Sequence, residues 1–232
     1  MNTTSTGLDP RPPGTVAPGA QVTPTDLCCR ALDLVVGTAL LVLLLPLLVL
    51  IGIAIRLDSP GTVVFSQRRF GRDLAVFTMN TLRTMHCGRS TAPHRDYVTR
   101  LIHADRASPS NGSGGLYKLQ HDERVTRLGR LLRRTSLDEL PQLWNVIRGE
   151  MSLVGPRPVI PYEVEHYPPD WCERFSVRPG LTGLWQVSGR SRLTYAEMVA
   201  LDLEYARRRS FWLNLAILAQ TPWVIAQGKD AA

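Results

Sequence analysis

One stretch of this sequence restricts the possible folds more than any other. The 22 residues from Leu34 to Ile55 carry no charged side chain, and Arg56 follows them directly. As an α-helix rising ~1.5 Å per residue the run is about 33 Å long, enough to cross the core of a bilayer. It begins too late and is too long for a cleaved signal peptide, and no small-residue cleavage site follows it. A buried helix of a soluble protein is a minor alternative for so leucine-rich a run, so we predict a membrane helix over 26–57.

The topology of this helix stays open on physical grounds alone. Pro46 lies in its middle and would kink it, so that the chain could enter and leave the membrane by the same face. A spanning helix fits equally well, because the arginines that follow, from Arg56 to Arg72, would hold the C-terminal side in the cytoplasm. In both arrangements the rest of the chain faces the cytoplasm.

The charge balance predicts an anionic partner. The net charge is +7 and the pI is near 9.7, which suits nucleic acid, lipid headgroups or a phosphorylated substrate. The histidines are scattered, and the cysteines show no spacing typical of zinc sites, so we expect reduced thiols and no metal site of that kind. The four cysteines are Cys28, Cys29, Cys87 and Cys172.

Composition divides the remainder of the chain into segments. Residues 1–25 are rich in Thr, Pro and Gly and predict a disordered tail, and 86–115 predict a mobile surface loop. Basic residues beside an apolar, tryptophan-containing segment at 207–227 indicate a helix lying in the headgroup zone, although a core helix with a basic cap fits equally well.

The segment after the membrane helix predicts a small hairpin followed by helices. Two β-type runs, 62–70 and 74–79, flank a turn at Gly71. From Val125 to Arg134 apolar residues recur at helical spacing, with arginines on the other face. The overall prediction is an α+β protein with a mainly helical cytoplasmic domain over 58–232.

The densest group of chemically useful residues lies between 133 and 158. Asp138 and Glu139 are adjacent carboxylates, and Pro141 follows within one helical turn. Because proline is tolerated in the first turn of a helix, we expect a helix starting at Leu137–Asp138 with Ser136 as its N-cap and Ser136-x-x-Glu139 as a capping box. On local grounds, acidic residues there usually only cap the helix; alternatively they form a reactive pair at its positive end.

An arginine fixed between prolines follows this helix. Gly149 ends the helix, and Arg157 lies within Val-Gly-Pro-Arg-Pro. A guanidinium in a rigid loop suits bidentate recognition of a phosphate or carboxylate. Pairing with Glu150, with no chemical role, is the alternative.

Seven ordered motifs resemble those of the bacterial polyprenyl-phosphate sugar-1-phosphate transferases, the monotopic phosphoglycosyl transferases that initiate exopolysaccharide and O-antigen assembly. The similarity runs from about Cys29 to Gly228. The motifs are Arg30-x-x-Asp33, Pro46, Ser59-Pro-Gly61, Gln67-x-Arg69-x-Gly71, Arg83-Thr-Met85, Ser136-Leu-Asp-Glu-Leu-Pro-Gln-Leu143 and Met151-Ser-Leu-Val-Gly-Pro-Arg-Pro158. This agreement favours the reactive pair over simple capping.

The resemblance implies a helix that re-enters at Pro46 and a ping-pong reaction at the cytoplasmic face of the bacterial inner membrane. Asp138 would attack the sugar-linked phosphate of a UDP-sugar, release UMP and pass the phosphosugar to undecaprenyl phosphate. Mg²⁺ would bind at Asp138, and Glu139 would position the metal or activate the lipid phosphate. The resemblance also implies that the substrate phosphates are bound by Arg133, Arg157, Arg83, Arg69 and Gln67. The lipid headgroup would enter at Arg30 and Asp33.

The stretch Arg178 to Arg190 resembles the hexose-1-phosphate branch, which uses UDP-glucose or UDP-galactose. Without the extra N-terminal membrane helices of longer members, we expect a stand-alone catalytic unit. The chain departs from the family at Cys29-Arg30 and Thr81-Leu82-Arg83, where lysines are usual. We expect the bilayer but not nucleic acid as a partner, and leave a homodimer open. A membrane-tethered adaptor and a metal-dependent diphosphate hydrolase are the competing functions.

Overall fold

The computed structural model describes residues 23–86, 98–100, 102 and 124–227 of the chain. The predicted tail 1–25 and loop 86–115 lie almost wholly outside these residues. In chain order the elements are α1 (Pro24–Asp58), β1 (Val64–Phe70), η1 (Arg72–Leu74), β2 (Val76–Leu82), α3 (Arg127–Thr135), η2 (Leu137–Glu139), α4 (Gln142–Arg148), β3 (Ser152–Val154), α5 (Pro161–Val164), η3 (Pro169–Ser176), β4 (Gly180–Thr182), α6 (Leu184–Ser188), η4 (Arg190–Arg192), α7 (Tyr195–Arg208) and α8 (Phe211–Gln227).

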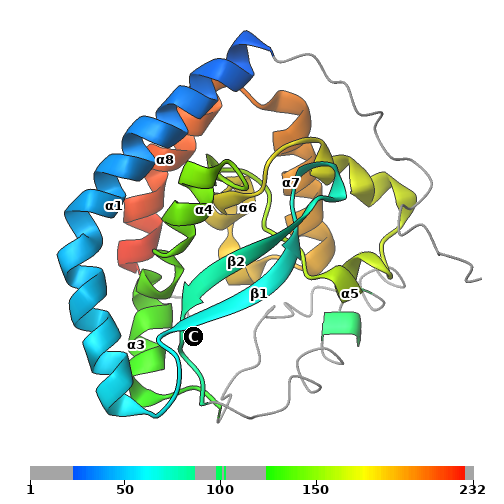
Figure 1. The fold of residues 1–232 in the computed structure, drawn as a ribbon. Helices are drawn as coiled ribbons and strands as arrows, with labels where there is room; N and C mark the ends of the chain where they lie inside the picture. The colour runs from blue at the N-terminus through cyan, green and yellow to red at the C-terminus, as the bar shows by residue number, and fades with distance from the viewer. Residues whose placement is uncertain (1–22, 87–97, 101, 103–123, 228–232) are drawn as a thin grey trace, which may run out of the picture.

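The long apolar run forms α1, a single helix of 35 residues that contains Pro46. It begins at a capping box in which Thr23 and Asp26 bond each other's backbone N–H, and it runs along one side of the molecule with α3, α4 and α8 beside it (Figure 1). Only 11% of its most apolar window is buried, and side chains such as Leu43 are largely exposed. Among the described residues, α1 is the one helix long and apolar enough to cross a membrane.

The predicted hairpin is confirmed. Strands β1 and β2 pair antiparallel from Val64↔Leu82 to Phe70↔Val76, and η1 closes the turn after Gly71. A second sheet was not predicted: β3 and β4, three residues each, pair in parallel through Ser152↔Gly180 and Val154↔Thr182. The described part of the chain is thus a mixed α+β structure with two small sheets, of which Figure 1 labels the β1–β2 hairpin.

The main core lies between the hairpin, α4, β3, α7 and α8. Its buried side chains include Phe77, Leu143, Val146, Met151 and Tyr205. The predicted 207–227 segment divides at this core, because its arginines end α7 and α8 begins only at Phe211. The tryptophans of α8 remain outside the core: Trp212 is 76% exposed and Trp223 is 70% exposed.

Helix α3 confirms the predicted helix near 125–134. It packs against Thr84, which lies two residues after the end of β2. A Cβ added to Gly129 would lie 2.1 Å from the backbone oxygen of Thr84, so only glycine allows this approach. The Thr84 oxygen also accepts a bond from the backbone N–H of Thr126 at 3.0 Å. The end of β2 therefore fixes the start of α3.

This close contact predicts that Gly129→Ala lowers the thermal unfolding midpoint of the protein in detergent. The new methyl group must push α3 away from Thr84, and overpacking of this kind costs about 1–3 kcal/mol. Gly37→Ala is the matched control, since its Cβ would meet Val146 Cγ1 at an ordinary 3.5 Å while alanine favours the helix. Equal midpoints for the two variants would contradict the contact.

Candidate active site

The two adjacent carboxylates lie in a single turn between two helices. Asp138 and Glu139 belong to η2, which follows α3 and precedes α4, and both side chains are half-buried. Ser136 enters the turn in the left-handed conformation (φ 56°), and the backbone N–H groups of Glu139 and Leu140 bond carbonyls three residues earlier. Because η2 also packs against β2, the carboxylates are held by the hairpin as well as by the helices.

The predicted capping box at this turn is wrong. Ser136 caps the end of α3 with its own N–H, and its side chain makes no capping bond to η2. The helix begins at Gln142 and not near Leu137, because Pro141 has no N–H to give to residue 137. A 3₁₀ turn bridges the gap, so the carboxylates precede the first residue of α4 by about one helical turn.

Arg133 lies in the last turn of α3, just before the carboxylates. Its Nε donates to Thr84 Oγ1 at 2.9 Å, which ties the arginine to the end of β2. The structure therefore brings Arg133 and the Asp138–Glu139 turn to the same end of the hairpin. Thr84 lies within the Arg83-Thr-Met85 motif, but no role was predicted for it, since its partner lies 49 residues away.

The loop that carries Arg157 is held at four successive carbonyl groups. Pro156 and Pro158 have no N–H, so bonds to carbonyls are the main way to fix this loop. The carbonyl oxygens of residues 156, 157, 158 and 159 accept, in that order, from Gly180 N (2.8 Å), Arg174 Nη2 (3.3 Å), Arg69 Nη1 (3.1 Å) and Phe70 N (2.9 Å).

Arg69 therefore binds the Arg157 loop directly, and Gln67 is linked to the loop through Arg69. The Arg69 side chain is buried, and its Nη2 donates to Gln67 Oε1 at 2.8 Å while Nη1 holds the Pro158 carbonyl. Their direct contact with a substrate phosphate stays a prediction. Glu150, the alternative partner for Arg157, instead accepts from Asn145 Nδ2 at 2.6 Å and pairs with Arg148.

Arg83 lies at the far end of α1. Its buried guanidinium donates to the backbone oxygens of Ile55 (3.2 Å) and Ser59 (2.7 Å) and also to that of Pro60. The carbonyl of Ser59, at the C-cap of α1, is one of those that every helix leaves without an intrahelical partner, whereas the Ile55 carbonyl also accepts from Ser59 N at 3.2 Å. The side chain thus joins the hairpin to α1, and its predicted phosphate contact stays a prediction.

Arg30 and Asp33 join the other end of α1 to the domain. Arg30 donates to the carbonyls of Val146 (2.6 Å) and Ile147 (2.7 Å) at the end of α4. Asp33 is buried, and its Oδ1 accepts from Leu153 N (2.8 Å) and Ser152 Oγ (3.0 Å) of β3. Both have structural partners, and a further contact with a lipid headgroup stays a prediction.

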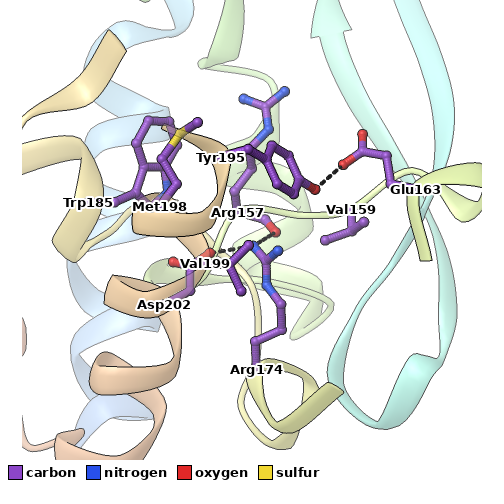
Figure 2. Close-up of a pocket in the computed structure, with 9 residues that line it drawn as sticks. All are labelled: Arg157, Val159, Glu163, Arg174, Trp185, Tyr195, Met198, Val199 and Asp202. Carbon is purple, nitrogen blue, oxygen red and sulfur yellow. Dashed lines mark hydrogen bonds and ion pairs between the residues drawn. The ribbon is translucent and has the colours of Figure 1, made fainter. Parts of the chain in front are cut away.

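A buried ion pair that the sequence did not reveal lies beneath Arg157. Arg174 of η3 and Asp202 of α7 pair with each other, and both line a small hollow together with Arg157 (Figure 2). Burial raises the pKa of Asp202 to about 6, although Arg174 and the backbone N–H of Arg157 act to lower it. Burial would lower the pKa of Arg174, but the Asp202 carboxylate raises it above its ordinary value.

The metal-binding capacity of the site is limited to the adjacent carboxylates. No group of three or more His, Cys, Asp or Glu side chains suited to a metal occurs in the described ranges. Mg²⁺ is commonly held by only one or two carboxylates together with substrate phosphates. Asp138 and Glu139 fit that mode of binding, whereas a dedicated all-protein metal site would need more ligands.

The matches to known proteins cover nearly all of the described chain. Residues 25–228 match the family model for bacterial sugar transferases. The chain belongs to the bacterial sugar transferase family. A UDP-glucose:undecaprenyl-phosphate glucose-1-phosphate transferase of Caulobacter vibrioides is 42% identical over 204 residues, which is 84% of this chain and 68% of that protein.

Other relatives carry related names. A UDP-galactose-lipid carrier transferase of Erwinia amylovora is 41% identical over 88% of this chain and 41% of its own length. An undecaprenyl-phosphate galactose phosphotransferase of Salmonella typhimurium is 35% identical with the same two coverages. The chain thus spans about two fifths of the length of those two relatives.

The contacts of Asp33 predict a stability effect that depends on the replacement. Asp33→Ala leaves the buried Leu153 N–H without its acceptor, which costs about 1–3 kcal/mol, whereas Asp33→Asn keeps an oxygen there. The thermal midpoint in detergent should therefore fall more for alanine than for asparagine. An alanine variant as stable as the wild type would show that the tie between α1 and β3 contributes nothing.

Proposed function

We propose that this sugar transferase moves a sugar-1-phosphate from a UDP-sugar to undecaprenyl phosphate and releases UMP, as an early step of exopolysaccharide synthesis. The observation that carries this proposal is the Asp138–Glu139 pair, held in one turn beside Arg133 in a protein whose relatives are named for such transfers. The sugar is glucose or galactose, since a relative named for galactose and one named for glucose share 41% and 42% identity with this chain.

Asp138 is the nucleophile in this proposal. One of its carboxylate oxygens attacks the sugar-linked phosphorus of the UDP-sugar, and the bond from that phosphorus to the bridging oxygen breaks, so UMP leaves. An oxygen of the undecaprenyl phosphate then attacks the same phosphorus, and the bond to Asp138 breaks. The carboxylate is regenerated, and the product is undecaprenyl-diphospho-sugar.

Attack of a carboxylate on an anionic diphosphate requires nearby positive charge. Arg133 is tied beside the carboxylates through Thr84, and Arg157 is presented by a loop whose carbonyls are all held. We assign both guanidiniums to the phosphates of the donor, where charge-assisted and bidentate bonds are strongest. Mg²⁺ held by Asp138 and Glu139 together with the diphosphate would offset the remaining negative charge.

The contacts of α1 support a monotopic arrangement over a spanning one. Arg30 and Asp33 bind the domain near the start of the helix, and Arg83 binds its end, about 40 Å away at ~1.5 Å per residue. One folded domain therefore holds both ends. We place both on the cytoplasmic side, with the exposed apolar face of α1 and the tryptophans of α8 in the near leaflet.

The reaction is tested by UMP release from the detergent-solubilised full chain with Mg²⁺, undecaprenyl phosphate and UDP-glucose or UDP-galactose. We expect Asp138→Asn to lower the rate by about 10³-fold or more, as loss of a nucleophile does. Chelation with EDTA should abolish release, and added Mg²⁺ should restore it. Asp170→Asn, at an exposed position outside the site, is the matched control and should leave the rate unchanged.

Three outcomes would contradict this proposal. Release of UDP in place of UMP would mean ordinary glycosyl transfer. Continued UMP release without lipid acceptor, beyond one equivalent of enzyme, would mean hydrolysis. No release from either donor, with salt-sensitive binding to anionic vesicles that Asp138→Asn leaves intact, would favour a membrane-tethered adaptor.

The topology is tested by labelling the native Cys28, which is exposed near the start of α1, in a variant whose other cysteines are serine. A membrane-impermeant maleimide should leave it unlabelled in intact cells and label it once the cells are opened. Cysteine introduced at the exposed Leu57, at the other end of α1, should behave identically. Labelling of Cys28 from outside would mean that α1 spans the membrane.

A further inference from the structure

We propose that the buried Arg174–Asp202 pair is a positioning device that fixes the backbone of Arg157, so that its guanidinium meets the phosphates of the donor. This inference rests on the proposed function, because it takes Arg157 as the phosphate ligand. In the described part of the chain, the hydrogen bonds and the ion pair of Arg174 and Asp202 do not involve the Asp138–Glu139 turn. Both residues therefore act through Arg157.

The pair contacts Arg157 at its main chain. Arg174 Nη2 binds Asp202 and also donates to the carbonyl oxygen of Arg157 at 3.3 Å. The backbone N–H of Arg157 also acts to lower the pKa of Asp202, as the positive charge of Arg174 does. The carbonyl group of Arg157 is therefore held by the arginine of a buried ion pair. In Figure 2 the Arg157 guanidinium extends away from Arg174 and Asp202, which leaves it directed to another partner.

The guanidinium of Arg174 is itself held on a second side. Its Nη1 donates to the Tyr167 hydroxyl at 3.0 Å, and that hydroxyl contacts the hydroxyl of Tyr195. Tyr195 in turn donates to the buried carboxylate of Glu163 at 2.8 Å. This chain of bonds fixes the plane of the Arg174 guanidinium, and with it the direction in which Nη2 points.

Stability alone is a poor reason for such a pair. Arg174 is 4% exposed and Asp202 is 1% exposed, and removing two charges this completely from water costs about as much as their attraction returns. Apolar side chains of similar volume often give equal or greater stability at such positions. What apolar side chains do not supply is a directed bond to the main-chain carbonyl of Arg157, in a loop where prolines flank that residue.

The test uses the full chain carrying Arg174→Met and Asp202→Leu together, which removes both charges and keeps the volume. We expect a protein that still folds, because the lost bond to the carbonyl is set against the removal of two buried charges. The kcat/KM for the UDP-sugar should fall by about tenfold to a hundredfold, since small misplacements of a substrate ligand have effects of this size. A double variant that keeps the wild-type kcat/KM would overturn the inference.

A second ion pair between the same two elements, which does not contact Arg157, provides a matched control. Glu173 of η3 and Arg207 of α7 form an exposed ion pair, with Nε–Oε1 and Nε–Oε2 distances of 3.0 and 2.9 Å. Glu173→Gln with Arg207→Gln should leave kcat/KM unchanged. An equal loss in this control would mean that any disturbance between η3 and α7 lowers activity, and would overturn the assignment to Arg157.

A double-mutant cycle separates positioning from a general structural role. If the pair acts through Arg157, Arg157→Ala should lower kcat/KM strongly in the wild type but little further in the Arg174→Met, Asp202→Leu background. Full additivity of the two losses would contradict positioning.

Hydrogen–deuterium exchange reads the loop independently of activity. Amide exchange of the peptide spanning 152–160 should rise in the double variant and not in the Glu173, Arg207 control, and unchanged exchange would contradict the inference even for an inactive protein. The failures are distinguishable: a wild type that turns over no donor ends the proposed function, whereas an active wild type matched by the double variant ends this inference.

Discussion

The structure depends on the pairing of main-chain carbonyl groups that no strand or helix satisfies. Such groups are costly when buried, and they occur at the ends of α1 and α4 and along the loop of Pro156 and Pro158. Arginine guanidiniums pair with them at each place. Arg83 binds the end of α1, Arg30 binds the end of α4, and Arg69 and Arg174 bind the proline-flanked loop.

This use of arginine has consequences for the membrane. Because the arginine contacts join both ends of α1 to the same domain, the helix lies along the domain as part of its fold. Its outward face keeps an apolar surface that the domain does not cover, with Val42 66% exposed and Leu43 73% exposed. A lipid leaflet can cover such a surface, and the bonds from Arg83 to the carbonyls of Ile55 and Ser59 reduce the number of unpaired polar groups at the helix end.

The sequence predicted the local features of this fold well. The hairpin followed from two β-type runs on either side of Gly71, and α3 from its helical spacing. The capping box failed because the conformation of Ser136 is set by the end of α3, which local pattern does not reveal. The β3–β4 pair escaped notice because each strand has only three residues and its partner lies far along the chain.

The roles of individual arginines were harder to predict for a physical reason. A guanidinium can bind either a phosphate or a carbonyl oxygen. Which of them it binds depends on residues far away in the sequence, as Val146 is 116 residues from Arg30. Asp202 and Arg174 gave no local signal at all. The acidic pair was identified from its motif, yet its 3₁₀ turn and its contact with β2 emerged only in three dimensions.

The central claim is that Asp138 carries the phosphosugar between donor and lipid. The most direct measurement is the intact mass of the wild-type chain, quenched in acid after incubation with Mg²⁺ and a UDP-sugar but no lipid acceptor. We expect a gain of one hexose phosphate, assigned to Asp138 by peptide fragmentation and lost on addition of undecaprenyl phosphate. An unmodified protein under conditions where UMP and the lipid product still form with acceptor would contradict the account.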